Sequence, residues 1–218
     1  MSELVRTTLL ILAALFPIIN PPENIPIFVA LTSGLSPENR SVLARKIAVN
    51  GFALLIVSLL IGTHILAFFG ISVPIVQVGG GLVVIAAGWK LLNRPDDDAA
   101  ARSGSPKRFD DSYLSSWAFY PLTLPLTVGP GSISVAIALG ADRPAGSVAA
   151  WSLPVAAFLG CAMIALSIYI SYRFAEPIGR ALGQTAMSII VRLSSFILLC
   201  IGVQIVWNGA RKLLSAIS

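Results

Sequence analysis

The sequence has few charged residues. Asp, Glu, Lys and Arg make up 11% of its 218 residues, against about 25% in ordinary soluble domains. This excludes a water-soluble globule, because too few ionic groups remain to cover its surface. Disorder is excluded as well, since disordered chains combine low hydrophobicity with high charge, and here 56% of the residues are hydrophobic. The expected environment of the chain is therefore a lipid bilayer.

Histidine and cysteine are almost absent, with His64, Cys161 and Cys200 as the only examples. Both cysteines lie in apolar stretches without the spacing of a metal site, so we interpret them as buried thiols. The sequence contains no Ser-His-Asp arrangement and no phosphate-binding Gly-Lys-Ser/Thr loop. It therefore indicates no enzyme and no cofactor. The net charge of +5 is spread over many loops, which argues against nucleic acid as a partner.

Long stretches without charge predict membrane crossings, because charged side chains are costly in hydrocarbon. A crossing needs about 20 residues, so six helices fit the chain length and leave short loops. The fold class expected is therefore an all-α polytopic membrane protein. The predicted helices cover residues 4–31, 42–69, 72–92, 114–140, 147–172 and 187–213.

A polar stretch divides this single membrane domain of residues 1–218 into two halves. Residues 93–113 form the predicted linker between a first three-helix repeat, 1–92, and a second, 114–218. Three crossings per half require the second repeat to be inverted relative to the first. Eleven Lys and Arg residues lie on the linker side and four on the other. The positive-inside rule then places the linker in the cytoplasm and both termini outside.

Four prolines interrupt the first predicted helix between Pro17 and Pro26. Because each proline removes a backbone donor and clashes with the preceding turn, the pattern predicts a stop followed by a restart. Asn20 suits the N-cap of the restarted helix, Pro21 its first position and Glu23 its third, as in a capping box.

The fourth predicted helix contains a second interruption, with prolines at 121, 125 and 130. Here Gly129 would cap the restarted helix, Pro130 would take the first position, and Gly131 would leave the backbone bare. Two broken helices in matching positions are typical of transporters built from inverted repeats. The free N–H groups and the dipole of such helix ends favour an anionic group, such as a carboxylate.

The predicted substrate-binding residues come from both interruptions. They are Asn20, Pro21, Glu23, Asn24, Thr127, Gly129, Gly131 and Ser132. Glu23 is the only acid within a predicted crossing, which makes it a candidate for proton coupling; the alternative is a carboxylate that caps its own helix. Arg192 is a candidate charge partner for Glu23 or the substrate, unless it extends to the lipid headgroups.

Small residues at helical spacing predict close packing between helices. The aromatic residues Trp89 and Tyr172 lie near predicted helix ends and suggest a belt at the membrane interface. The small-residue patterns are Gly79-Gly80-Gly81, Ala86-Ala87-Gly88, Ser58-x-x-x-Gly62 and Ala156-x-x-x-Gly160.

At its two interruptions the chain resembles the MarC family of multi-pass membrane proteins. The matching motifs are Asn20-Pro21-x-x-Asn24-Ile25-Pro26-Ile27-Phe28 and Pro121-Leu122-x-x-Pro125-x-x-x-Gly129-Pro130-Gly131-Ser132-Ile133. Segment order, linker position and length fit over essentially the whole chain. The resemblance implies six transmembrane helices and a place among LysE-like exporters, some of whose relatives are described as neutral amino-acid transporters. Family sequences often have Gly where this chain has Glu23.

Together these features predict a secondary transporter in the inner membrane. The resemblance implies export of neutral amino acids or similar small metabolites, and the residues predict that half-helix N-termini hold the solute. Two alternatives remain open: an exporter of divalent metals or other ions, and a scaffold protein that transports nothing. The sequence also leaves open whether the protein forms a homo-oligomer.

Overall fold

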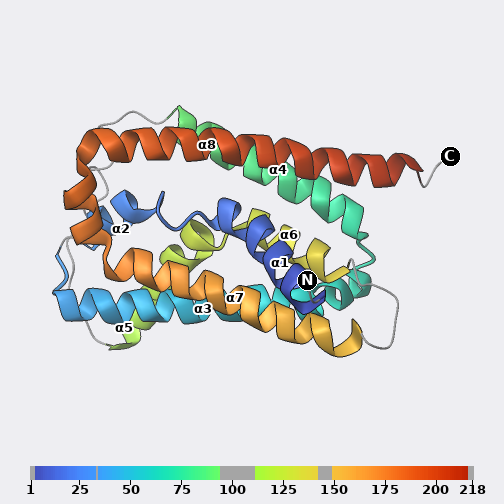
Figure 1. Cartoon of the computed structure of the whole chain (residues 1–218), viewed down its shortest axis with the longest axis horizontal. Helices are drawn as coiled ribbons and strands as arrows, with labels where there is room; N and C mark the ends of the chain where they lie inside the picture. The colour runs from blue at the N-terminus through green and yellow to red at the C-terminus, as the bar shows by residue number, and fades with distance from the viewer. Residues whose placement is uncertain (1–2, 33, 94–110, 142–148, 216–218) are drawn as a thin grey trace.

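The computed structural model describes residues 3–32, 34–93, 111–141 and 149–215, and they form long helices packed side by side (Figure 1). This confirms the predicted all-α class. The elements are α1 (Glu3–Ile19), α2 (Ile25–Leu31), α3 (Pro37–Phe68), α4 (Val73–Leu92), α5 (Asp111–Trp117), the irregular segment η2 (Ala118–Thr127), α6 (Pro130–Ala141), α7 (Ala149–Arg173) and α8 (Ala175–Ser215).

Four of the described helices, α3, α4, α7 and α8, contain a stretch long and apolar enough to cross a membrane. The helical stretches on either side of residues 128–129 make a fifth span if they are counted together, although they bend by 72° at this break. The predicted first crossing, 4–31, is instead split into α1 of 17 residues and α2 of 7. Each is shorter than the roughly 20 residues that a crossing needs, because the prolines end the first helix early.

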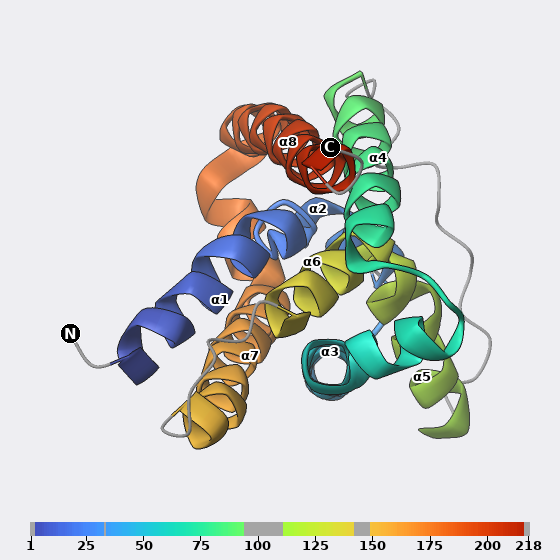
Figure 2. The same ribbon diagram turned by 90° about the vertical axis from the view of Figure 1, so that its right-hand side faces the viewer.

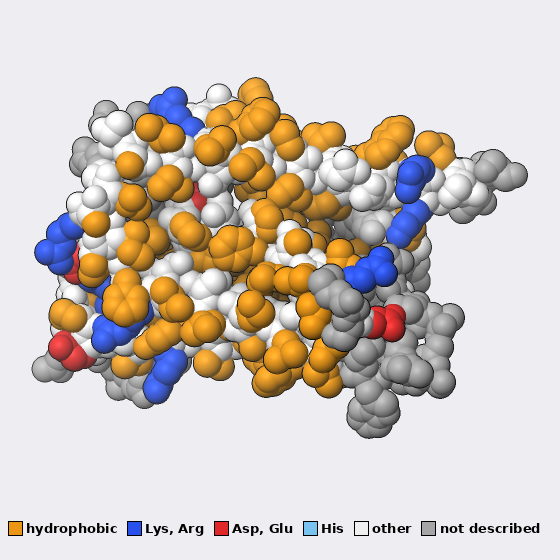
Figure 3. All heavy atoms as spheres, in the orientation of Figure 1, with side chains coloured by type: hydrophobic (Ala, Val, Ile, Leu, Met, Phe, Trp, Pro, Cys, Tyr) orange, Lys and Arg blue, Asp and Glu red, His pale blue; other side chains and the backbone are white. Residues whose placement is uncertain are grey.

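Hydrophobic side chains cover much of the outer surface. Figure 3 shows them over the middle of one face, with Lys and Arg side chains toward its two ends. Examples on three helices are Leu9 on α1, Phe158 and Leu166 on α7, and Phe196 on α8, all exposed. Such a surface is costly in water and is suited to contact with lipid chains. The described residues thus form an all-helical polytopic membrane protein with four or five candidate spans.

The long helices pair in opposite directions. Figure 1 shows α3 and α7 side by side and antiparallel, and likewise α4 and α8. In Figure 2, α4 and α8 lie together on one side of the molecule, while α1 and α6 lie between them and the pair of α3 and α7. Both termini of the chain lie toward the same end of the bundle (Figure 1).

Glycines allow α4 and α8 to approach closely. A Cβ added to Gly88 would lie 2.9 Å from the backbone nitrogen of Leu199, and one added to Gly81 would lie 2.9 Å from the carbonyl oxygen of Gly202. Gly160 brings α7 equally close to Ile11 on α1, where an added Cβ would lie 2.8 Å from Cγ2. The close packing predicted from the small-residue patterns is confirmed at these positions.

An ion pair joins three elements at the end of the bundle where α3 begins. The buried Arg40 binds Glu176 at the start of α8 through Nη1 and donates from Nη2 to the carbonyl of Thr32, 3.0 Å away. Arg180 binds the other oxygen of Glu176 at 3.0 Å. The hydrogen bond and charge of Arg40, together with the charge of Arg180, hold the pKa of Glu176 below its usual range.

The predicted last crossing, 187–213, agrees with the candidate span Ser188–Ser215. α8 also includes a helical stretch before this span, and the chain bends between the two at Gly183, whose φ of +71° suits glycine. Two sequence predictions require correction. Cys200 is exposed rather than buried, because it lies on an outward face of α8. Trp89 and Tyr172 were both expected at the membrane interface. Trp89 is exposed, as expected, but Tyr172 is fully buried. The predicted linker, 93–113, lies largely outside the described residues.

Candidate functional site

The first interruption is a tight turn that separates α1 from α2. Asn20 adopts φ of +39°, a conformation that Asn tolerates better than most residues, and directs the chain away from α1. Asn24, rather than Asn20, is the N-cap of α2, and Pro26 rather than Pro21 occupies its first turn. The predicted restart at Asn20 and Pro21 is therefore wrong by four or five residues.

Side chains within this turn satisfy one another and the end of α1. Asn24 Nδ2 donates to the carbonyl of Ile19, 3.3 Å away, and so satisfies an acceptor that the helix leaves free. Asn20 Nδ2 donates to Glu23 Oε2, while Ser195 Oγ on α8 donates to Glu23 Oε1 at 3.1 Å. Asn20 and Glu23 do interact, as predicted, but through their side chains rather than as a capping box.

The second interruption is longer and is stabilised by hydroxyl groups. Thr123 Oγ1 donates to the carbonyl of Ala118 and Thr127 Oγ1 to that of Leu122, each at 2.7 Å. Both bonds lie within the segment where Pro121 and Pro125 remove backbone donors, and they tie the threonine side chains to its backbone. The helix resumes at Pro130 with Gly129 before it, as the sequence predicted. Sequence reasoning missed Thr123, although the repeated Pro-x-Thr pattern was a signal for it.

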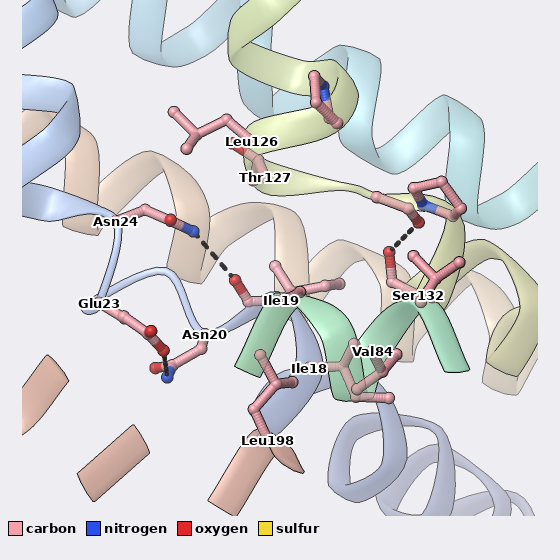
Figure 4. Close-up of a pocket in the computed structure, with 16 residues that line it drawn as sticks. Ile18, Ile19, Asn20, Glu23, Asn24, Val84, Leu126, Thr127, Ser132 and Leu198 are labelled. Atoms are coloured by element: carbon pink, nitrogen blue, oxygen red, sulfur yellow. Dashed lines mark hydrogen bonds between the residues drawn. The ribbon is translucent and has the colours of Figure 1, made fainter. Parts of the chain in front are cut away.

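A cavity of about 200 Å³ lies between the two interruptions. Figure 4 shows Asn20, Glu23 and Asn24 on one side of it and Ser132 on the other. Its lining residues are Ile18, Ile19, Asn20, Glu23, Asn24, Val83, Val84, Ala87, Pro125, Leu126, Thr127, Gly129, Pro130, Gly131, Ser132 and Leu198. For scale, an engineered apolar cavity of about 150 Å³ holds benzene. A small solute therefore fits this space.

The structure brings together seven of the eight predicted binding residues; only Pro21 is not part of the lining. Glu23 has 3% of its surface exposed, and Thr127 and Ser132 each have 2%. Ser132 Oγ donates to the carbonyl of Gly129, 2.9 Å away, at the start of α6. The predicted role of these residues in binding stays a prediction, but their convergence on one cavity is a finding.

Two further residues support the site and were not predicted for it. Ser195 binds Glu23 across 172 positions of sequence. Tyr172 stacks on Phe28 of α2, with ring centroids 4.4 Å apart, and its hydroxyl lies 2.8 Å from Thr127 Oγ1. Tyr172 thus connects the helix after the first interruption with the end of the second. No local pattern marks either residue, because each acts through distant parts of the chain.

Arg192 lies one turn before Ser195 on α8, and its side chain is exposed. The polar partners of Glu23 are Asn20 and Ser195. A pairing of Arg192 with Glu23 or with a substrate therefore stays a prediction.

Comparisons with known proteins agree with the sequence motifs. Residues 5–214 match the model of the family described as MarC family integral membrane protein. The chain is 31% identical over 218 residues to the inner membrane protein MarC of Escherichia coli strain K12, covering 98% of each chain. It has the same identity and coverage with the inner membrane protein MarC of Shigella flexneri. No solved structure matches the chain.

Proposed function

The chain belongs to the MarC family of integral membrane proteins, and from the cavity between its two interruptions we propose that it is a secondary transporter of small solutes. The proposed substrates are neutral amino acids or similar metabolites, moved outward across the inner membrane without chemical conversion. The observation that carries this proposal is that one cavity is lined by both broken segments, one from each half of the sequence.

The fold supports a mechanism in which the two halves move against each other. α3 packs against its counterpart α7, and α4 against α8, each pair antiparallel. In addition, α1 packs on α7 as its counterpart η2 packs on α3, which is the exchange expected for inverted repeats. We therefore propose that α1 and α2 together form a sixth crossing, and that rocking of one half opens the cavity to alternate sides.

The size and walls of the cavity support a small substrate. About 200 Å³ is below the range of about 300–1,000 Å³ for drug-sized ligands. Apolar side chains such as Ile18, Val84 and Leu198 form part of the wall, while polar groups gather at the two interruptions. This division fits a solute with a short apolar side chain and polar ends.

The distribution of cationic residues supports the proposed orientation. Arg40, Arg45 and Lys46 lie near the start of α3, and Arg173 and Arg180 lie at the same end of the bundle. Arg6 near the start of α1, and Arg211 and Lys212 near the end of α8, lie toward the opposite end. By the positive-inside rule, the end with the start of α3 faces the cytoplasm and both termini face outward.

Flux of radiolabelled alanine and glycine from liposomes that contain the purified full-length protein tests the proposal. We expect efflux above that of empty liposomes, and loss of efflux in Gly131→Leu. An added Cβ at Gly131 would lie 2.2 Å from Cγ2 of Val84, and both residues line the cavity, so a leucine would displace this wall. Gly79→Leu is the matched control, because an added Cβ at Gly79 meets nothing within 4 Å.

Two outcomes would contradict the proposal. Absence of flux for a panel of neutral amino acids would remove the substrate class, and divalent-cation flux in the same liposomes would favour an ion exporter. If a stably expressed Gly131→Leu variant keeps its function in cells, the alternative of a scaffold protein that transports nothing would be favoured instead.

A further inference from the structure

The cavity contains one carboxylate whose protein partners are neutral. Glu23 is 3% exposed and accepts hydrogen bonds from the amide of Asn20 and the hydroxyl of Ser195, one on each oxygen. A carboxylate offers about four acceptor positions, so these two bonds orient the group without using its full capacity. Glu23 therefore lines the cavity with acceptor positions still available.

The described residues that line the cavity include no Lys, Arg or His. An ionised carboxylate away from water is costly unless a cation or strong hydrogen bonds compensate it. A cationic ligand group would provide that compensation. A charge-assisted hydrogen bond to a carboxylate is also roughly twice as strong as a bond between neutral groups.

The opposite side of the cavity has the complementary polarity. Gly131 and Ser132 lie in the first turn of α6, and Gly129 precedes it; the first N–H groups of this 12-residue helix have no partner within the helix. The aligned peptide dipoles add partial positive charge at this end. Figure 4 shows Ser132 across the cavity from Glu23. With Glu23 ionised, the two sides present opposite charge to a ligand between them.

We infer that the Glu23 carboxylate binds the protonated amine of the transported solute, while the start of α6 receives its carboxylate. This inference rests on the proposed function and makes it more specific: the ligand is a zwitterion, and the protonated amine is its essential group. Ser195 and Asn20 are positioning residues, because they hold the two oxygens of Glu23. The apolar wall at Val84 and Leu198 then limits the side chain of the solute.

Equilibrium binding to the purified full-length protein in detergent micelles tests this assignment separately from transport. The probe is radiolabelled alanine, displaced by unlabelled alanine, by alaninamide, which keeps the amine but lacks the carboxylate, or by N-acetylalanine, which lacks the charged amine. We expect displacement by alanine and alaninamide, and none by N-acetylalanine at the same concentrations.

Substitutions identify the protein group. Glu23→Gln keeps the size of the side chain and should weaken alanine binding by about 10- to 100-fold, the range for loss of one charge-assisted hydrogen bond. Glu38→Gln, the same change at an exposed position at the start of α3, should bind as the wild type does. Elution volume and thermal midpoint of each variant show that it is folded.

Two results would overturn the inference while leaving transport intact: N-acetylalanine displacing alanine as well as alaninamide does, or alanine flux and binding unchanged in Glu23→Gln. Failure of wild-type protein to bind alanine or alaninamide would overturn it outright. Amine-dependent binding without flux would support the site and reject transport. If Glu23→Gln does not fold, the ligand series on the wild-type protein decides the question.

Discussion

The turn at residues 20–24 and the segment at 118–129 both end a helix beside the same cavity, yet their freed backbone groups are satisfied differently. The first turn uses Asn24 to bind the end of α1 and holds a carboxylate, Glu23, at the cavity. The second uses the hydroxyls of Thr123 and Thr127 and leads into the start of α6, with no charged side chain. One interruption contributes a carboxyl side chain, and the other contributes backbone donors.

This difference shows that two breaks of similar cause need not provide equivalent binding groups. Proline ends the helix in both places, but the residues beside the prolines decide what the cavity receives. The comparison also explains why the prediction of two facing positive helix ends was incomplete. α2 has only 7 residues, so its dipole is weak, and Glu23 dominates its side of the cavity.

The largest effect is expected when the side of the cavity at the second interruption is filled and the first interruption is left unchanged. Gly131→Leu should reduce amino-acid flux to the level of empty liposomes, because its side chain collides with Val84. The flux assay with Gly79→Leu as control measures this effect. Flux close to that of the wild type in Gly131→Leu would show that the start of α6 is not part of the path.

The next largest effect is expected on stability at the contact between α4 and α8. Gly88→Leu would place a side chain against the backbone of Leu199 and should lower the free energy of unfolding by about 1–3 kcal/mol, as overpacking does. Thermal unfolding in detergent, with Gly79→Leu on the same helix as control, provides the measurement. Equal midpoints for the two variants would contradict the prediction, because they would show that a side chain between α4 and α8 does not destabilise the protein.

A smaller effect is expected from the connection between the two interruptions. Tyr172→Phe keeps the stacking on Phe28 but removes the hydroxyl beside Thr127, which should cost about 0.5–1.5 kcal/mol. Tyr169→Phe, on the same helix and only partly buried, is the matched control. Comparing the unfolding midpoints and the alanine flux of both variants tests the link. A larger loss in Tyr169→Phe would reject it.

The smallest effect is expected far from the cavity, at the pair of Arg40 and Glu176. The pKa of Glu176 is lowered in the folded protein, so its contribution to stability is present above the pKa of the unfolded chain and is lost as pH falls through the folded value. Thermal midpoints of the wild type should therefore decrease toward acid more than those of Glu176→Gln. Parallel pH profiles for the two proteins would contradict this, and Glu3→Gln is the control.

The sequence located the second restart correctly but misplaced the first. Gly129-Pro130 is a single cap signal, and α6 begins there. The first interruption contains two such signals, Asn20-Pro21 and Asn24-Ile25-Pro26. Packing selects the second, because Ile25 and Phe28 become buried in α2 and Phe28 stacks on Tyr172. Local capping preferences of about 1 kcal/mol cannot decide between sites when tertiary burial contributes more.

Low charge, apolar stretches and clustered prolines are enough to establish that this chain is a helical membrane protein with two broken segments. Those features act within a few residues of one another, through solvation and backbone geometry, so they can be recognised along the chain. Folding in three dimensions determined that the two breaks share one cavity and that Ser195 binds Glu23. It also placed the buried Tyr172 in contact with both Phe28 and Thr127. These contacts join residues far apart in sequence, and they depend on the combined packing of all the helices rather than on any local pattern.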